Sequence, residues 1–579
     1  MSSEPINTVD TDVLIIGAGG AGMSAAVAAA QAGRRVTLVD RSLIGRGGAT
    51  IMAQMTVAVA LGEQVPDDWR FHYADTLKAG RGLCSEPLAR LLCEKGVDAI
   101  KQMDAWGTGW ARADGHMVQA HAPGHDRPRC VYVDYLNTGP AVAKTLRTQV
   151  AKNDAIDRLG DILVVDVLVE GGRAVGAVGL HLTTGQVLIM RAAAVVVATG
   201  GLTRLYARNS ASLNMGGDGY ALALRAGAQL IDMEFVQFFP IGHLAPRLVG
   251  FDPIMWDPFR YKLGGRLLNG RGEEFVEKYG HQAEKEGYTV TRDAATYAIL
   301  KEVEAGRGSP AGGAYLSFEH VPEAELRKAF GPIIDKLAAN GIDLTKGPIE
   351  VAPIAHYHMG GVKVDVAMRT TVPGLFAAGE AVGGANGANR LSGNAITEAI
   401  TFGLQAGRSA AEWSQTHAAP APADLARLAA PWVKALTTAP AAHVSRPNVA
   451  AQIARLQGIM QQYVGPFRTQ QGLQKALELL DVLDAEVGHA VAGGTGAQDP
   501  VQIDALDLRN MLMVARAVTQ CALNRTESRG AHQREDYPGM DDSWVLNQVL
   551  SWHDGHFNVT QQNVERLQGD DAVTQPVSA

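Results

Sequence analysis

The chain has few cysteines, few aromatic residues and little net charge. Only 4 of its 579 residues are cysteines, and none of them forms a CxxC pair. This argues against a zinc site, an iron–sulfur cluster and a disulfide framework, so we expect no metal within the chain and a reducing compartment. A net charge of −8 gives no reason to expect nucleic-acid binding.

Long apolar runs are missing as well. No segment approaches the roughly 18 consecutive apolar residues of a membrane-spanning helix, and residues 1–12 lack the basic start and apolar stretch of a secretory signal. We therefore expect a cytoplasmic protein whose membrane association, if any, goes through a partner. The length predicts about two to four domains, and a hydrophobic content of 46% supports a sizeable core.

Glycine is abundant, and the first glycine-rich segment follows a short apolar run at 13–16 that predicts a strand. Gly17, Gly19 and Gly22 then open an alanine-rich helix, and a second strand over 36–39 completes a β-α-β unit. In this spacing the first glycine permits the turn, the second lets the backbone approach a pyrophosphate, and the third packs helix on strand. Asp40 then lies where a ribose hydroxyl binds. The pattern predicts a dinucleotide site without distinguishing NAD from FAD.

The rest of the chain has coarser signals. A second apolar strand at 193–198 ends in Thr199-Gly200-Gly201, and the alternation over 160–189 predicts a β-meander. An alanine- and proline-rich linker at 418–423 precedes a segment, 425–555, that the sequence predicts to be helical, and 566–579 resembles a polar tail.

The most informative segment runs from 356 to 394. It contains His-Tyr-His-Met-Gly-Gly at 356–361, Ala-Ala-Gly-Glu at 377–380 and Asn-Arg-Leu-Ser-Gly-Asn at 389–394. With the N-terminal unit and Glu-Ser-Arg-Gly-Ala-His at 527–532, it resembles the succinate dehydrogenase/fumarate reductase flavoprotein family over most of the chain. The resemblance implies an α/β fold with three parts: a Rossmann-like FAD-binding domain of 1–234 and 352–415, an inserted capping domain of 235–351, and a C-terminal helical domain of 425–579.

The resemblance also implies which residues bind the FAD cofactor. They are Gly17, Gly19, Gly20, Gly22, Asp40, Arg41, Gly48, Ala49, Thr50, Thr199, Gly200, Asp218, Glu380 and Asn394. Ala49 lies in the stretch where membrane-complex members carry the histidine that bonds to the flavin, so we expect non-covalent FAD. Without that bond, the family's chemistry shifts toward reduction of a C=C bond or oxidation of a more easily oxidised substrate.

Members of this family pass a hydride between the flavin and a carbon next to a carboxylate, while an arginine moves the proton at the neighbouring carbon. The matching residue is Arg292, and a guanidinium pKa above ~12 requires a relay that resupplies the proton. His356 and Arg390 match the residues that clamp one substrate carboxylate, a task that suits a guanidinium fork. The alternatives are a helix-start arginine paired with a carboxylate at Arg292 and a structural strand histidine at His356.

The chain departs from the family where the second carboxylate of succinate or fumarate is held. Phe239 replaces the histidine of His-Pro-Thr-Gly, and the stretch around Trp256 has no Thr-Glu pair. An apolar wall cannot compensate a buried carboxylate, so we expect a substrate with one carboxylate and an apolar, aromatic or weakly polar far end. His243 or Arg260 would restore a dicarboxylate site. The substrate-site candidates are Phe239, His243, Trp256 and, ranked after His356, His358.

The sequence therefore predicts an FAD-dependent oxidoreductase that acts on the α,β carbon–carbon bond of a carboxylic acid, as an enoate reductase or an acid dehydrogenase. An iron–sulfur partner subunit is the expected source or acceptor of electrons, because no other redox centre is encoded. The alternatives are a succinate dehydrogenase or fumarate reductase flavoprotein, an L-aspartate oxidase-like enzyme and a non-catalytic flavin-binding protein. The joint presence of Arg292, His356 and Arg390 argues against the last.

Overall fold

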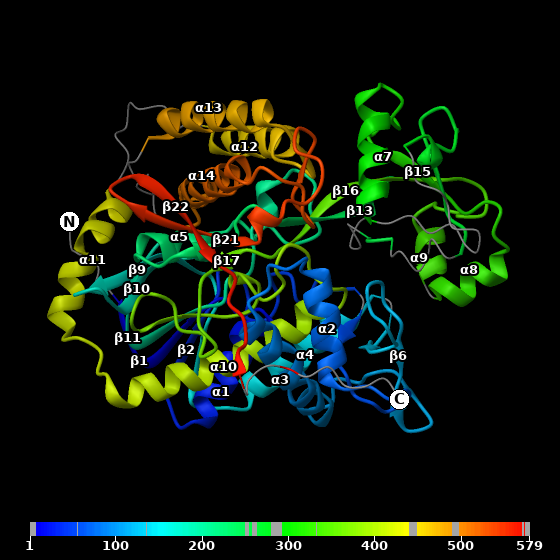
Figure 1. The fold of residues 1–579 in the computed structure, drawn as a ribbon. Helices are drawn as coiled ribbons and strands as arrows, with labels where there is room; N and C mark the ends of the chain where they lie inside the picture. Colours follow the sequence, from blue (N-terminus) through cyan, green and yellow to red (C-terminus); the bar gives the residue numbers. More distant parts are fainter. Residues whose placement is uncertain are drawn as a thin grey trace. The chain divides into compact units, whose positions relative to one another are not determined.

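A computed structural model of the chain describes residues 7–54, 56–134, 136–248, 254–256, 263–279, 292–331, 333–438, 448–488, 497–569 and 573, without the side chains of 292–294. The chain divides into two compact units (Figure 1). The first consists of 1–207, 211–235 and 357–579, and the second of 208–210 and 236–356. The predicted capping domain, 235–351, corresponds to most of the second unit. The predicted C-terminal domain lies inside the first unit, because some of its helices pack on the main sheet and the others pack on those helices.

The core of the first unit is a seven-stranded sheet in the order β8-β2-β1-β11-β10-β9, with β18 also paired to β11. Strands β8, β2, β1, β11 and β18 are parallel to their neighbours in this group, whereas β10 and β9 are antiparallel. Both the β-α-β unit and the meander are thereby confirmed. The strands are β1 (Asn7–Ile16), β2 (Val36–Val39), β8 (Ile156–Leu159), β9 (Ile162–Glu170), β10 (Arg173–His181), β11 (Val187–Val197) and β18 (Leu375–Ala377).

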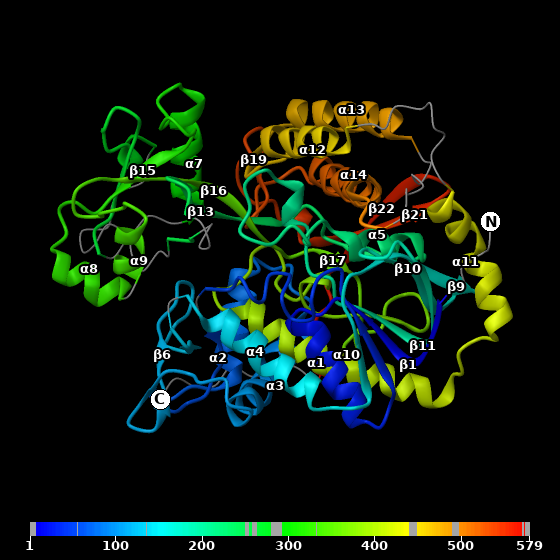
Figure 2. The same cartoon turned by 180° about the vertical axis from the view of Figure 1, so that it is seen from behind.

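Two helices, α1 (Gly20–Gln31) and α10 (Asn394–Thr416), pack closely against each other (Figure 2). Helices α3 (Glu86–Ala105) and α4 (Thr138–Ala151) lie beside them. Small residues allow this approach. A Cβ at Gly403 would lie 2.3 Å from the carbonyl oxygen of Ala21, and one at Gly407 would lie 2.2 Å from that of Ala25. The N-terminus of α1 follows the glycine turn after β1, and that of α10 follows the 389–394 segment.

Further helices and strands complete this part of the first unit. The helices are η1 (Thr203–Leu205), α2 (Trp69–Ala79), α3 (Glu86–Ala105), α4 (Thr138–Ala151), α5 (Asp218–Arg225) and η3 (Gly379–Ala381). The strands are β3 (Val57–Ala58), β4 (Arg112–Ala113), β5 (His116–Met117), β6 (Gln119–Ala120), β7 (Cys130–Val131), β12 (Leu230–Ile231) and β17 (Gly361–Val362).

The C-terminal part begins with helices, as predicted. They are α11 (Pro422–Thr437), α12 (Val449–Tyr463), α13 (Gln470–Val487) and α14 (Pro500–Asn524). Through Leu425, Ala429 and Leu436, α11 covers the antiparallel strands of the main sheet. The helical prediction fails near 555, because β21 (Leu546–His553) and β22 (His556–Asn563) form a hairpin that pairs with β12. Short strands β19 (Phe467–Arg468) and β20 (Gln533–Arg534) and the helix η4 (Asp542–Trp544) complete this part.

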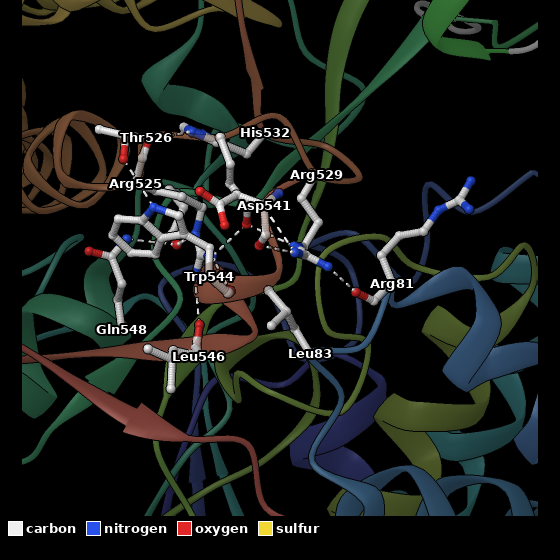
Figure 3. A network of polar contacts seen from close by, with 12 residues as sticks. Arg81, Leu83, Arg525, Thr526, Arg529, His532, Asp541, Trp544, Leu546 and Gln548 are labelled. Atoms are coloured by element: carbon white, nitrogen blue, oxygen red, sulfur yellow. Dashed lines mark hydrogen bonds and ion pairs between the residues drawn. The ribbon is translucent and has the colours of Figure 1, made fainter. Parts of the chain in front are cut away.

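Buried arginines hold this C-terminal part together. Arg525, whose side chain is 0% exposed, donates to Glu234 at 2.6 Å, to Glu527 at 2.9 Å and to the carbonyl oxygens of Trp544 and Leu546 (Figure 3). Arg529 donates to both carboxylate oxygens of Glu527 at 2.7 and 2.9 Å, and to the carbonyl oxygen of Arg81. The network ties the hairpin and its preceding loop to the segment after β12 and to the loop after α2.

The second unit is built on a four-stranded sheet in the order β13-β16-β15-β14, formed by β13 (Val236–Ala245), β16 (Ile349–His358), β15 (Ala314–Ser317) and β14 (Arg266–Leu268). The last two residues of β16 already belong to the first unit. Around the sheet are η2 (Val276–Tyr279), α7 (Arg292–Glu304), α8 (Glu323–Phe330) and α9 (Ile333–Ala339). No helix in the described part of the chain is long and apolar enough to cross a membrane.

Candidate active site

The turn between β1 and α1 has the backbone that a pyrophosphate site needs. Gly17 has φ +103°, and a Cβ there would lie 2.4 Å from the carbonyl oxygen of Ala198. A Cβ at Gly22 would lie 1.8 Å from the carbonyl oxygen of Gly17. The first turn of α1 contains no acidic residue, and Thr50 Oγ1 accepts the N–H of Gly20 at 2.9 Å. The N-terminal end of α1 thus retains the positive potential that favours a phosphate.

Asp40 is fixed at the end of β2 by three hydrogen bonds. Its Oδ2 accepts the N–H of Ala18 at 2.6 Å, and its Oδ1 accepts the N–H and the hydroxyl of Ser42 at 2.8 and 2.7 Å. The carboxylate therefore lies beside the glycine turn, where the sequence predicts a ribose.

Two further features on this side fit a bound FAD. The Thr199 hydroxyl is buried and has no hydrogen-bond partner among the residues that the structure describes, which is unusual for a buried polar group. Gly48 has φ +78°, and a Cβ there would meet nothing within 4 Å. An unsatisfied hydroxyl and open space beside glycine both suit a large polar ligand. Three other predicted cofactor residues adjoin these groups: Gly19 is in the turn after β1, Ala49 follows Gly48, and Gly200 follows Thr199.

Arg41 and Asp218, predicted cofactor residues, have protein partners instead. Arg41 donates two hydrogen bonds to Asp507 of α14, at 2.8 and 2.9 Å, and one to Asp218 at 3.3 Å. Asn510 of α14 donates to the other oxygen of Asp218 at 2.9 Å. Both residues therefore connect the cofactor side of the sheet to α14, a contact that short sequence motifs cannot reveal because α14 is so distant along the chain, and their role in binding FAD stays a prediction.

Asn394 is also engaged within the protein. Its Oδ1 accepts from His72 Nε2 at 2.8 Å, and its Nδ2 donates to the Thr76 hydroxyl at 3.2 Å. His125 Nε2 donates to the carbonyl oxygen of Ser392 at 2.7 Å. Burial lowers the pKa of His72 to about 3 and that of His125 to about 4, so both are neutral. These histidines brace the turn after Arg390, and His72 and Thr76 orient the Asn394 side chain, whose cofactor role stays a prediction.

His358, the second-ranked histidine, is a structural residue. It is 0% exposed, its Nε2 donates to the carbonyl oxygen of Met233 at 3.0 Å and its Nδ1 lies 3.0 Å from the Tyr220 hydroxyl. Burial lowers its pKa to about 4. Its backbone N–H donates to the Glu380 carboxylate at 3.1 Å, and burial raises the pKa of Glu380 to about 8. Both ring nitrogens are thus in use, and none is left for a substrate.

Arg390 is buried and stacked on a tyrosine. Its guanidinium carbon lies 4.5 Å from the centroid of the Tyr357 ring, within the range of a cation–π interaction, and its Nη1 donates to the carbonyl oxygen of Leu391 at 3.2 Å. The Tyr357 hydroxyl donates to Glu398 at 2.7 Å, and Asn386 donates to the same carboxylate oxygen at 2.6 Å. Sequence reasoning missed Tyr357, Asn386 and Glu398, because no short motif connects them.

In the second unit, His356 is flanked by a serine and a phenylalanine. Its Nδ1 lies 2.8 Å from the Ser210 hydroxyl, and its ring is edge-on to that of Phe239 with centroids 6.0 Å apart. The strands β13 and β16 bring the two rings together. Ser210 was not predicted, because nothing in the sequence marks it as a partner of His356.

His243 and Trp256, which the sequence predicts to be substrate residues, are buried in the second unit. His243 Nε2 donates to the carbonyl oxygen of Pro246 at 2.6 Å, and its Nδ1 accepts from Trp256 at 3.4 Å. Trp256 is 0% exposed and packs against Phe318 and Phe330. A large aromatic residue at this position fills the core of the unit. Arg260 lies outside the described residues, and Arg292 begins α7 with its side chain also outside them.

Comparison with known proteins gives consistent matches over almost the whole chain. Residues 12–396 match the FAD binding domain family, and 453–575 match the fumarate reductase flavoprotein C-terminal family. A fumarate reductase (CoM/CoB) subunit of Methanothermobacter marburgensis is 33% identical, covering 94% of this chain and 97% of that one. L-aspartate oxidase of Streptomyces coelicolor is 33% identical, covering 94% and 91%. The solved structure of Mycobacterium smegmatis Sdh1 in complex with UQ1 superposes with a TM-score of 0.87 at 32% identity, covering 97% and 95%.

Proposed function

The chain belongs to the succinate dehydrogenase/fumarate reductase flavoprotein family and is an FAD-dependent oxidoreductase acting on CH–CH bonds, and from this premise we propose that it interconverts an α,β-unsaturated carboxylic acid and its saturated form. The proposed substrate has one carboxylate and a far end without a second. The observation that carries this specificity is the Phe239 ring packed against His356. The absence of the family's Thr-Glu pair from the sequence around Trp256 also supports it.

Each protein group has one task in the proposed reaction. Bound FAD supplies the hydride exchange. Arg390 binds the substrate carboxylate. This interaction withdraws negative charge from the reacting carbons and fixes their position. The family resemblance assigns His356 to the same carboxylate and Arg292 to the proton at the neighbouring carbon. The hydroxyl of Ser210 holds the His356 ring in one orientation, and Tyr357 supports the Arg390 guanidinium from one face.

A partner that carries electrons is part of the proposal. Relatives of this chain bear the names of subunits, among them the fumarate reductase subunit of Methanothermobacter marburgensis and the succinate dehydrogenase flavoprotein subunit of Rickettsia bellii. No group of three or more His, Cys, Asp or Glu residues that could hold a metal occurs in the described part of this chain. We infer that a separate iron–sulfur subunit exchanges electrons with the flavin.

The substrate class is tested by mixing photoreduced enzyme anaerobically with a panel of acids and following flavin reoxidation. We expect cinnamate or crotonate to reoxidise the flavin faster than fumarate, because an apolar wall disfavours a second carboxylate. The methyl esters of the same acids should be inactive, since they lack the anionic anchor. Rapid reoxidation by fumarate with no response to the mono-acids would establish the dicarboxylate alternative. Oxidation of L-aspartate by the oxidised enzyme would instead favour an L-aspartate oxidase.

The attachment of the cofactor gives a second prediction. Ala49 has only a methyl side chain and cannot form a bond to the flavin, so we expect denaturation to release all of the FAD. The measurement is the flavin absorbance of the supernatant and the pellet after precipitation with trichloroacetic acid. A fluorescent band that persists at the size of the chain on a denaturing gel would contradict non-covalent binding.

A further inference from the structure

Glu398 is a buried acid with an incomplete set of partners. Its side chain is on α10, and the residue is 1% exposed. Its Oε2 accepts hydrogen bonds from both Tyr357 and Asn386, at 2.7 and 2.6 Å. Its Oε1 is buried and has no hydrogen-bond partner among the residues described. An ionised carboxylate left half-satisfied in the interior is costly unless a cation lies close or a proton neutralises it.

The cation near Glu398 is Arg390, and Tyr357 connects the two. The guanidinium lies over one face of the tyrosine ring while the tyrosine hydroxyl donates to Glu398. Removing the acid would leave the hydroxyl without its acceptor and the ring without its anchor. The orientation of Arg390 thus depends on Glu398 through the tyrosine that lies between them.

Burial raises the pKa of Glu398 to about 7, opposed by the two hydrogen bonds and by the positive charge of Arg390. The other titratable groups that face it stay uncharged or are acids themselves. Glu380 of η3 has a pKa raised to about 8 by burial. Burial raises the pKa of Tyr220 of α5 and of Tyr357 of β16, so both stay neutral. On the segments that pack against α10 or precede it, burial also keeps His72 of α2, Cys93 of α3 and Cys84 beside the 386–387 turn neutral. No titratable side chain occurs in α1 or β3.

We propose that Glu398 is a positioning residue of the carboxylate site, which orients the Arg390 guanidinium through Tyr357 and takes up a proton from solvent when a substrate carboxylate binds to Arg390. This rests on the proposed function, in which Arg390 is the anionic anchor. In the free enzyme, one buried cation balances one buried anion. A bound carboxylate adds a second negative charge beside the same cation, and protonation of Glu398 restores the balance.

The proposal gives a specific pH dependence of binding. Since binding favours protonated Glu398, affinity for a carboxylate is highest below the pKa of the free enzyme's Glu398 and is lost as the pH rises above it. The dissociation constant should increase about tenfold per pH unit in that range. In Glu398→Gln, whose side chain is neutral at every pH, the dissociation constant should stay near its low-pH value. We expect Glu398→Gln to bind about tenfold or more tightly than the wild type near pH 8.5.

The experiment uses the FAD-loaded chain with benzoate and malonate as non-reacting mono- and dicarboxylate probes. Binding is followed by the change in flavin absorbance between about pH 6 and pH 9, and proton uptake by calorimetry in phosphate and Tris buffers, which differ in ionisation enthalpy. Glu412→Gln, an exposed acid on the same helix, is the matched control and should behave as the wild type. FAD content and melting temperature establish that each variant is folded.

The outcomes separate this inference from the proposed function. Proton uptake that persists in Glu398→Gln assigns the proton to another group and overturns the inference. Tyr357→Phe keeps the ring under Arg390 but removes the link to Glu398, so it should alter the pH profile, and an unchanged profile also counts against the inference. If Arg390→Gln binds the probes as the wild type does, or if the wild type binds neither probe, the carboxylate site itself is wrong.

Discussion

Replacing Arg292 with alanine is expected to lower the rate of flavin reoxidation by an enoic acid by a factor of ~10²–10⁴, the usual contribution of a general acid, while FAD remains bound. The rate should fall because Arg292 is the only residue to which we assign the proton that is added at the carbon next to the hydride acceptor. Residues of the cofactor site lie in the first unit, whereas Arg292 begins α7 in the second. The measurement is single-turnover stopped-flow spectroscopy of the reduced enzyme, together with the FAD-to-protein ratio.

A matched variant makes this result interpretable. Arg327→Ala removes another arginine of the second unit, one that is exposed and paired with Glu323 on α8 and Asp335 on α9. It should leave the rate unchanged, because exposed ion pairs of this kind contribute little. Arg292→Lys should retain a small part of the activity, since an ammonium donates a proton without the planar fork. If Arg292→Ala turns over at the wild-type rate, its catalytic assignment is refuted. If no acid reoxidises even the wild-type flavin, the non-catalytic alternative gains support.

Local structure was predictable from the sequence where the information is itself local. The strand, glycine turn and helix at 13–32 form one continuous motif, and the positive φ of Gly17 and its contact with Ala198 follow from the need for a tight turn against β11. The same holds for the meander over 160–189, whose turn residues and alternation lie within one short segment. Each of these predictions depended on neighbours in the sequence.

The interaction partners of individual side chains could not be predicted from local sequence. Arg41 matched a cofactor position by type and place, but Asp507 provides its ion pair from a helix far along the chain. Trp256 suggested a substrate wall, yet Phe318 and Phe330 enclose it in a core. The β21–β22 hairpin, which the sequence analysis missed, could have been predicted from Asp554-Gly555. This pair is typical of a two-residue hairpin turn, and both residues have positive φ. Tertiary partners, rather than residue type, decide which polar groups remain for ligands.

Replacing the buried Arg525 is expected to have a large effect on the stability of the folded protein. Arg525→Met should lower the free energy of unfolding by about 3–5 kcal/mol, the usual cost of removing one partner from a buried ion pair. Glu234 and Glu527 are both 0% exposed and would be left as buried carboxylates without that cation, and two backbone carbonyls would lose their donor (Figure 3). Urea denaturation of the apoprotein and the holoprotein, followed by far-UV circular dichroism, measures the change.

The control is Arg455→Met on α12, where the arginine is 41% exposed and pairs with Glu486. A surface pair of this kind is worth about 0–1 kcal/mol, so the control should unfold close to the wild type. Equal losses in the two variants would mean that burial of the Arg525 network contributes nothing specific. The substitution is to methionine in both cases, which retains most of the aliphatic volume and isolates the effect of the charge.

The loss in Arg525→Met should also depend on pH. Burial and the charge of Glu234 raise the pKa of Asp232 to about 7, while Arg525, 3.9 Å away, lowers it. A carboxyl group whose folded-state pKa is raised favours folding at low pH and loses that contribution as the pH rises through the folded-state value. Without Arg525 the pKa of Asp232 rises further, so at about pH 8 the folded variant must either hold a proton there or bury an unpaired charge. At about pH 5.5 Asp232 is largely protonated in both folded proteins, and its share of the difference disappears. We therefore expect a larger loss at pH 8 than at pH 5.5, and a loss that is the same at both would show that Asp232 is not coupled to Arg525.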